Sequence, residues 1–123
     1  MKKGLTINEI AEAVHALAKE KGWHDEAEQT DHFIERMCNN IHDEVSELHT
    51  AWRDNCLYLS CDKAVQMKEM NLKPLTCLEE EMADIIIRAL DACMKLKLNP
   101  QDIIARKHIY NTTRPFRHGG KRS

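Results

Sequence analysis

Apolar residues recur at helical spacing in two separate runs in the first half of the chain. Thr6 stands three residues before Glu9, which is typical of a capping box, and the apolar pattern that follows predicts a helix ending at Gly22. After a polar, turn-like stretch, a second periodic run begins near Thr30 and fades around Asp54. These patterns predict two helices joined by a short loop.

The second half of the chain predicts two more helices. Thr76 and Glu79 form another capping box and open a long helix that is expected to reach about Leu98. The Asn-Pro pair at 99–100 provides an N-cap and a proline at the first helical position. A last helix is therefore expected from this pair to residues 111–113.

Composition agrees with an all-helical chain. Only six of the 123 residues are aromatic and three are Val, whereas Leu, Ile, Met and Ala are abundant. Residues 56–73 carry no clear period, and we expect the second helix to continue to residue 61 before a loop. We therefore expect an all-α, four-helix bundle-like subunit, with an all-α domain at 1–111 and a basic C-terminal tail at 112–123.

The net charge of −2 conceals two unlike parts. Residues 112–123 hold four basic residues and no acid, so residues 1–111 hold 14 basic and 20 acidic residues. No apolar run has the length of a membrane span or the core of a signal peptide, and we expect a soluble, cytoplasmic protein with no membrane partner. The five cysteines include no CxxC pair and are expected to be reduced thiols.

Each long helix carries two acids three residues apart, and one acid of each pair encroaches on the apolar face. The apolar stripe of the second helix comprises Met37, Ile41, Val45, Leu48 and Trp52. On a helical projection Glu44 lies on the shoulder of this stripe and Glu47 at its border. The stripe of the third helix comprises Leu78, Met82, Ile85, Ala89, Ala92 and Leu96. Glu81 falls inside that stripe, and Asp84 lies on its corresponding flank.

Acids in these positions call for a compensating cation. Burying a carboxylate without a partner costs several kcal/mol, and four close together also repel one another. Hard divalent ions prefer ligation by oxygen alone, and Mg²⁺ is commonly shared between carboxylates and substrate phosphates. The competing interpretation is that the acids are simply solvated, as most acids on helices are. The residues by themselves leave both interpretations open.

The end of the chain supplies positive charge. Lys107 and Asn111 share a helix face, Arg114 follows at the same spacing, and Lys121 lies in the basic tail. These residues are either a solvated helix end and tail or a clamp for phosphate oxygens. We expect no nucleic-acid polymer as a partner, because the acidic body would repel its backbone.

Together these motifs resemble those of the MazG-like nucleotide pyrophosphohydrolases, in the all-α NTP pyrophosphatase superfamily. The resemblance rests on Glu44-x-x-Glu47, Glu81-x-x-Asp84, Lys107-x-x-x-Asn111-x-x-Arg114-Pro115 and Arg117-His118-Gly119-Gly120-Lys121. The family's acid motif usually begins with two successive acids, and Asp43 holds the first position here. The 33 residues between Glu47 and Glu81 form a longer gap than usual, so the connecting segment departs from the family.

The resemblance implies an enzyme that uses Mg²⁺, with Mn²⁺ as a substitute, to cleave a (d)NTP to (d)NMP and pyrophosphate in nucleotide-pool housekeeping. By this resemblance Glu44, Glu47, Glu81 and Asp84 are the catalytic, metal-holding residues. Lys107 and Asn111 would contact the phosphates or sugar, with Arg114 and Lys121 closing over them. His15 and Trp23 stand where relatives place residues near the base. Which acid accepts the proton of the attacking water stays open.

A second apolar stripe bears on assembly. Ile86, Ile87, Leu90 and Met94 lie roughly opposite the Ile85 face of the third helix. A helix that is apolar on both sides is buried on both sides, so we expect a homodimer or homotetramer, as the resemblance also implies.

Two other protein classes compete with this interpretation. A di-iron helical protein requires Glu-x-x-His on two helices, which neither Glu44 nor Glu81 begins. A non-catalytic helical oligomerisation or interaction protein, with its acids as mere surface charge, remains the alternative.

Overall fold

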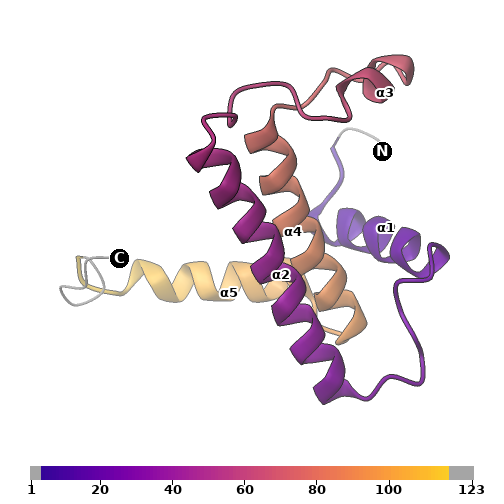
Figure 1. Cartoon of the computed structure of the whole chain (residues 1–123). Coiled ribbons are helices and arrows are strands. Elements are labelled where there is room, and N and C mark those ends of the chain that lie inside the picture. The colour runs from indigo at the N-terminus through magenta and orange to yellow at the C-terminus, as the bar shows by residue number, and fades with distance from the viewer. Residues whose placement is uncertain (1–3, 117–123) are drawn as a thin grey trace.

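A computed structural model describes residues 4–116 of the chain (Figure 1). The described residues form five helices: α1 (Ile7–Glu20), α2 (Thr30–Arg53), α3 (Ala64–Glu69), α4 (Cys77–Lys95) and α5 (Pro100–Thr112). Ser60 and Thr76 form an isolated antiparallel β-bridge. The all-helical class and the four expected helices are confirmed, and α3 is an addition. None of the helices in residues 4–116 has the length and apolar character needed to span a membrane.

Local capping sets three of the helix starts. The Thr6 hydroxyl accepts the backbone N–H of Glu9 at 3.1 Å, and the Glu9 carboxylate accepts that of Thr6 at 3.0 Å. Thr76 and Glu79 repeat this exchange at the start of α4, with the same two distances. Asn99 caps α5 with its side chain, ahead of a proline in the first turn. Each start predicted from a cap is confirmed.

The second helix ends earlier than expected, at Arg53 and not at residue 61. Asn55 adopts a left-handed conformation with φ of 57°. Its N–H bonds to the Trp52 carbonyl at 3.2 Å, and that of Cys56 bonds to the Ala51 carbonyl at 2.9 Å. These two bonds form a Schellman motif, which satisfies the last carbonyls and stops the helix.

A Schellman motif also ends α4, at Lys95 and not at Leu98 as expected. Lys97 has φ of 59°, and the N–H of Leu98 bonds to the Cys93 carbonyl at 2.8 Å. Gly22, with φ of 79°, closes α1 in the same way. A glycine takes this conformation without steric cost, so that it is a clear sequence signal for a helix end. Asn and Lys take it less readily and are weaker signals of a helix end.

Helix α4 is the centre of the fold (Figure 1). It packs against α2 and against α1, whereas α5 contacts α1 and α4 and then projects away from the other helices (Figure 1). The buried apolar side chains are Ala11, Phe33, Cys61, Leu90, Ala92 and Pro100. These buried positions lie on α1, α2 and α4, on the segment before α3 and at the start of α5, so that α4 is covered by α1 and by α2 separately.

Part of the apolar stripe predicted for the core lies outside it. Val45, Trp52 and Met82 are 46%, 60% and 42% exposed, whereas Glu44 is buried at 8% exposure. Helix α2 is thus rotated so that its Glu44 shoulder, and not the middle of the apolar stripe, faces the core. Burial of Leu90 on the second stripe of α4 shows that the chain partly covers both sides of this helix, while Ile86 and Ile87 stay exposed.

Candidate functional site

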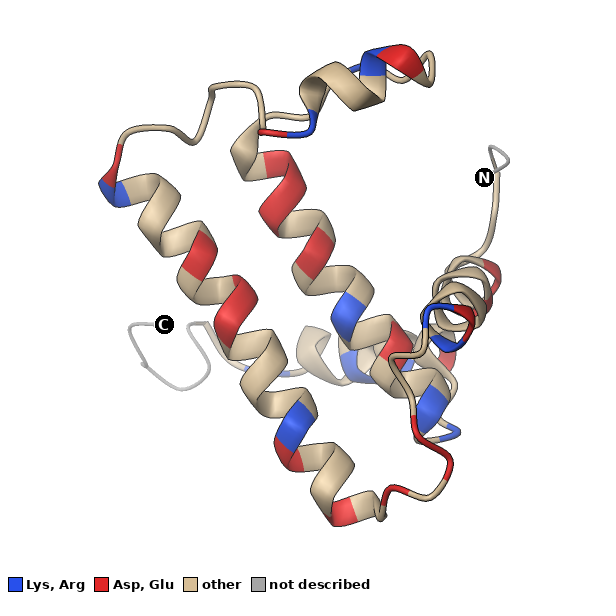
Figure 2. Ribbon diagram, turned by 45° about the vertical axis from the view of Figure 1, so that its right-hand side comes forward, with Lys and Arg blue, Asp and Glu red and all other residues tan. Residues whose placement is uncertain are grey.

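Three of the four predicted acids converge between α2 and α4. Figure 2 shows acidic segments on both helices where the two run side by side. Glu44, Glu81 and Asp84 each offer a carboxylate oxygen, and these oxygens all lie within 4.8 Å of one another. Below, these three residues together with the adjacent Glu47 are called the acid cluster. The i, i+3 spacing on each helix places both acids of a pair on the flank that faces the neighbouring helix.

The acid cluster is short of hydrogen-bond donors. Glu44 Oε2 and Glu81 Oε2 are buried and have no hydrogen-bond partner among the described residues. Loss of solvation, followed by the charge of Glu47, raises the pKa of Glu81 to about 7. Loss of solvation and the charge of Glu44 also raise the pKa of Asp84 and that of Glu47. The packing therefore holds negative charge that the side chains around it do not fully compensate.

One guanidinium reaches the acid cluster. Arg88 Nε lies 3.2 Å from Glu44 Oε1. Lys63, on the connection before α3, pairs instead with Glu80 and with Asp62, and the hydrogen bond that Lys63 donates to Glu80 raises the Lys63 pKa well above its usual range. Oxygen ligands in excess of nearby cations are the donor set that a hard divalent ion takes. The residues present thus fit Mg²⁺.

A cavity of about 300 Å³ adjoins the acid cluster, and Glu44 and Asp84 line one side of it. Val14, Leu17 and Ala18 of α1 line the apolar side. An apolar hollow bordered by a few polar groups is the usual form of a small-molecule site.

Trp23 connects this cavity to the acids. Its ring lines the cavity, and Arg88 Cζ lies 4.2 Å from the ring centroid. Because the same guanidinium bonds Glu44, one side chain contacts both the aromatic wall and the acid cluster. The spacing of Arg88, four residues after Asp84 on the same flank, was the available sequence signal for this role.

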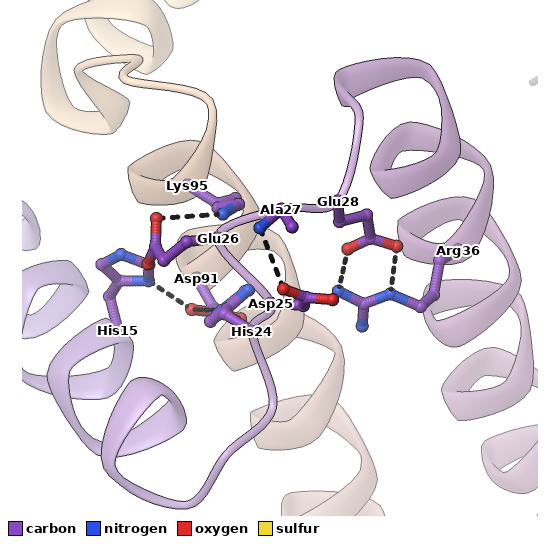
Figure 3. Close-up of polar contacts among 9 residues, drawn as sticks. All are labelled: His15, His24, Asp25, Glu26, Ala27, Glu28, Arg36, Asp91 and Lys95. Atoms are coloured by element: carbon purple, nitrogen blue, oxygen red, sulfur yellow. Dashed lines mark hydrogen bonds and ion pairs between the residues drawn. The ribbon is translucent and has the colours of Figure 1, made fainter.

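His15 lies beside the cavity and not among its lining residues. Its Nδ1 atom is 2.7 Å from Asp91 Oδ1, and His24 Nε2 is 2.9 Å from both oxygens of the same carboxylate (Figure 3). Asp91 itself lines the cavity. Sequence reasoning did not single out His24 or Asp91, although Asp91 follows Asp84 by two helical turns.

The predicted phosphate-contacting residues lie on α5 and after it. Lys107 and Asn111 are exposed, Arg114 is half-buried, and Lys107 Nζ lies 4.9 Å from the Tyr110 ring. No hydrogen bond, ion pair or cavity of residues 4–116 joins these side chains to the acid cluster. Lys121 and the rest of the tail from 117 onward lie outside the described residues.

Comparisons with protein-family models, with curated proteins and with solved structures gave no match. All five cysteines are free thiols, and no group of possible metal ligands found in residues 4–116 contains one.

Proposed function

We propose that this protein hydrolyses a nucleoside triphosphate, (d)NTP, to the monophosphate and pyrophosphate with the help of Mg²⁺. The proposal is carried by the convergence of three carboxylates, with two buried oxygens lacking partners, beside an apolar cavity. It also rests on the resemblance of the motifs to MazG-like pyrophosphohydrolases.

In this proposal Glu44, Glu47, Glu81 and Asp84 hold the metal. Bound Mg²⁺ would neutralise phosphate oxygens and lower the pKa of the attacking water. Glu44 is fixed by burial and by Arg88, whereas Glu47 is the exposed member of the acid cluster. A carboxylate that is not fully engaged with metal accepts the proton of the water.

The cavity beside the acids is proposed to receive the base. Its volume of about 300 Å³ lies at the lower end of the range for small-molecule sites. Trp23 offers an aromatic face for stacking, and Arg88 beside it offers N–H donors toward either the base or the nearest phosphate. His15 acts on this wall through Asp91, its hydrogen-bond partner.

A second copy of the chain is proposed to complete the site. Ile34, Val45 and Trp52 form an exposed apolar stripe along α2, and α5 leaves Ile104, Ile109 and Tyr110 exposed. Packing of copies through these surfaces would bury them and would bring Lys107, Asn111 and Arg114 of one copy toward the acids of the other. The expected assembly is a homodimer or a homotetramer.

The reaction class is tested with a panel of common and modified NTPs and dNTPs in the presence of Mg²⁺. The expected products are a monophosphate and pyrophosphate in equal amounts. Release of a diphosphate and single phosphate would refute the reaction class even if the protein proved active.

The shared site is tested by mixing two inactive variants, Glu81→Gln and Lys107→Ala. If each site takes its acids from one copy and its lysine from another, half of the dimers are mixed and one of their two sites is intact. Activity then recovers to about a quarter of the wild-type value. No recovery, in dimers that light scattering shows to be mixed, contradicts the shared site.

A non-catalytic oligomerisation protein is the alternative, and the exposed apolar stripe on α2 favours it. Under this alternative Mg²⁺ has no effect on stability. Under the proposed function Mg²⁺ stabilises the wild type and not Glu81→Gln, so thermal unfolding with and without Mg²⁺ separates the two.

A further inference from the structure

A second group of ligand-type side chains lies about two turns farther along α4 than the acid cluster, where Asp91 also lines the cavity. His15 comes from α1, His24 from the loop between α1 and α2, and Asp91 from α4 (Figure 3). One ligand atom of each lies within 4.8 Å of the others. The two imidazole rings stand edge to face, with centroids 5.0 Å apart, and both point at the carboxylate. These three residues are called the histidine cluster.

The side chains of the histidine cluster are withdrawn from solvent. They are 19%, 2% and 14% exposed for His15, His24 and Asp91. Two imidazoles and one carboxylate, brought together from three segments, form a ligand set of borderline softness. Zn²⁺ and its neighbours in the transition series take such sets, whereas Mg²⁺ prefers oxygen alone.

The described Lys and Arg side chains pair with acids other than Asp91 of the histidine cluster. Arg36 pairs with Glu28 at 2.8 Å and Lys95 with Glu26 at 3.7 Å, as Figure 3 shows. Arg88 pairs with Glu44. In the described part of the chain, the ion pairs of Asp91 are made with the two imidazoles alone.

A buried nitrogen of His24 without a hydrogen-bond partner in the described part of the chain also points to a bound ion. Its Nδ1 atom is buried and has no hydrogen-bond partner among residues 4–116. Ligation through Nε2 places the ring proton on Nδ1, where a metal-bound histidine normally donates to an outer partner. A separate cavity of about 20 Å³ is lined by His24 and Asn40, and it has room for one water molecule as that partner.

We propose that His15 Nδ1, His24 Nε2 and Asp91 bind one transition-metal ion of the zinc class. The ligand atoms now sit at hydrogen-bond distances of 2.7 and 2.9 Å. Tetrahedral ligation at about 2.0–2.2 Å separates ligand atoms by roughly 3.3–3.5 Å, so they move apart by about 0.5 Å on binding. Three protein ligands leave one position for water. The ion ties α1 and the Trp23 loop to α4.

The test is a titration of the metal-free full chain with Co²⁺ in excess Mg²⁺, followed by displacement with Zn²⁺. One equivalent is expected to bind, with the visible bands of cobalt on nitrogen and oxygen ligands and no sulfur-to-cobalt charge-transfer band. His15→Gln and Asp91→Asn should each weaken binding more than about 100-fold, beyond the loss of an outer-shell partner. His42→Gln, an exposed histidine on α2, is the matched control and should bind as the wild type does.

Glu81→Gln separates this site from the acid cluster, since it should bind Co²⁺ as the wild type does whether or not the proposed hydrolysis is correct. Zn²⁺ in excess Mg²⁺ should raise the melting temperature of the wild type and of Glu81→Gln, by linkage of binding to folding. This second measurement does not require any variant of the histidine cluster to fold. The proposal is overturned by absence of binding in Mg²⁺, by sulfur ligation, by unchanged affinity in folded His15→Gln and Asp91→Asn, or by loss of binding in Glu81→Gln.

Discussion

The acid cluster and the histidine cluster stand two turns apart on α4, at Asp84 and Asp91, and they balance charge in opposite ways. The acid cluster offers oxygen alone, has one arginine, and leaves two buried carboxylate oxygens without partners among the described residues. In the histidine cluster both oxygens of Asp91 accept hydrogen bonds from imidazoles. The type of ligand atom, more than closeness alone, therefore separates a hard-ion site from a transition-metal site.

The largest expected effect is the loss of enzymatic activity when a carboxylate of the acid cluster is replaced. Glu44→Gln and Glu81→Gln should each lower Mg²⁺-dependent turnover at least about 100-fold, because each removes a ligand charge without changing side-chain size. Steady-state assays of pyrophosphate release measure the effect. Glu35→Gln, an exposed carboxylate on α2, is the control and should keep wild-type activity. Full activity in both cluster variants would contradict the assignment.

The next effect concerns Arg88, the side chain that touches both Glu44 and Trp23. Arg88→Met should destabilise the metal-free protein by about 2–3 kcal/mol at pH 8, because it leaves the buried Glu44 charge without its cation. Mg²⁺ should recover most of this loss. Urea unfolding with and without Mg²⁺ measures both quantities, and Trp23 fluorescence should change with the loss of the stacked guanidinium. Equal stability of Arg88→Met and the wild type without metal would contradict the role of Arg88 as the cation that compensates Glu44.

A smaller effect follows from the pKa of Glu81, which is raised to about 7. A carboxyl with a raised pKa favours the folded state when protonated, so its contribution is complete below the usual 4.5 and is lost as the pH rises through about 7. The metal-free protein should lose about 1–2 kcal/mol of stability between pH 5 and pH 8, after allowance for solvent screening.

Glu81→Gln should flatten this pH dependence, since glutamine has no proton to lose. Urea midpoints measured across the pH range provide the check. An unchanged slope in Glu81→Gln would show that other groups cause the pH dependence.

The smallest effect is expected at the edge of the acid cluster. Lys63→Met removes the exposed partner of Glu80 and should cost at most about 1 kcal/mol, as for other solvent-exposed ion pairs. The loss should shrink in high salt, in contrast to the effect of Arg88→Met. Thermal unfolding at two salt concentrations distinguishes them, and equal salt dependence would mean that both pairs are equally solvated.

Much of the fold could be predicted because its signals are local. Thr6 with Glu9, Thr76 with Glu79 and Asn99 start helices through contacts three residues apart. The predicted ends of α2 and α4 were wrong because Asn55 and Lys97 adopt a left-handed conformation that the neighbouring sequence does not indicate. The short helix α3 was missed because it has too few residues to show a helical period.

The candidate site was half predictable for a related reason. The acids stand out because they interrupt an apolar stripe, whereas His24 lies in a loop and Asp91 follows the expected pair on a helix already assigned to the core. Val45 and Trp52 were expected inside and lie outside, since the rotation of α2 depends on which shoulder meets α4.

The sequence by itself determined where four helices begin and which acids lie on their apolar shoulders, because capping and helical periodicity act within a few residues. The tertiary structure alone decided that Glu44, Glu81 and Asp84 meet, that Arg88 joins them to Trp23, and that His15 and His24 share Asp91. The contacts between different segments join side chains 37 to 76 residues apart, and the packing of α1 and of α2 against α4 brings them together.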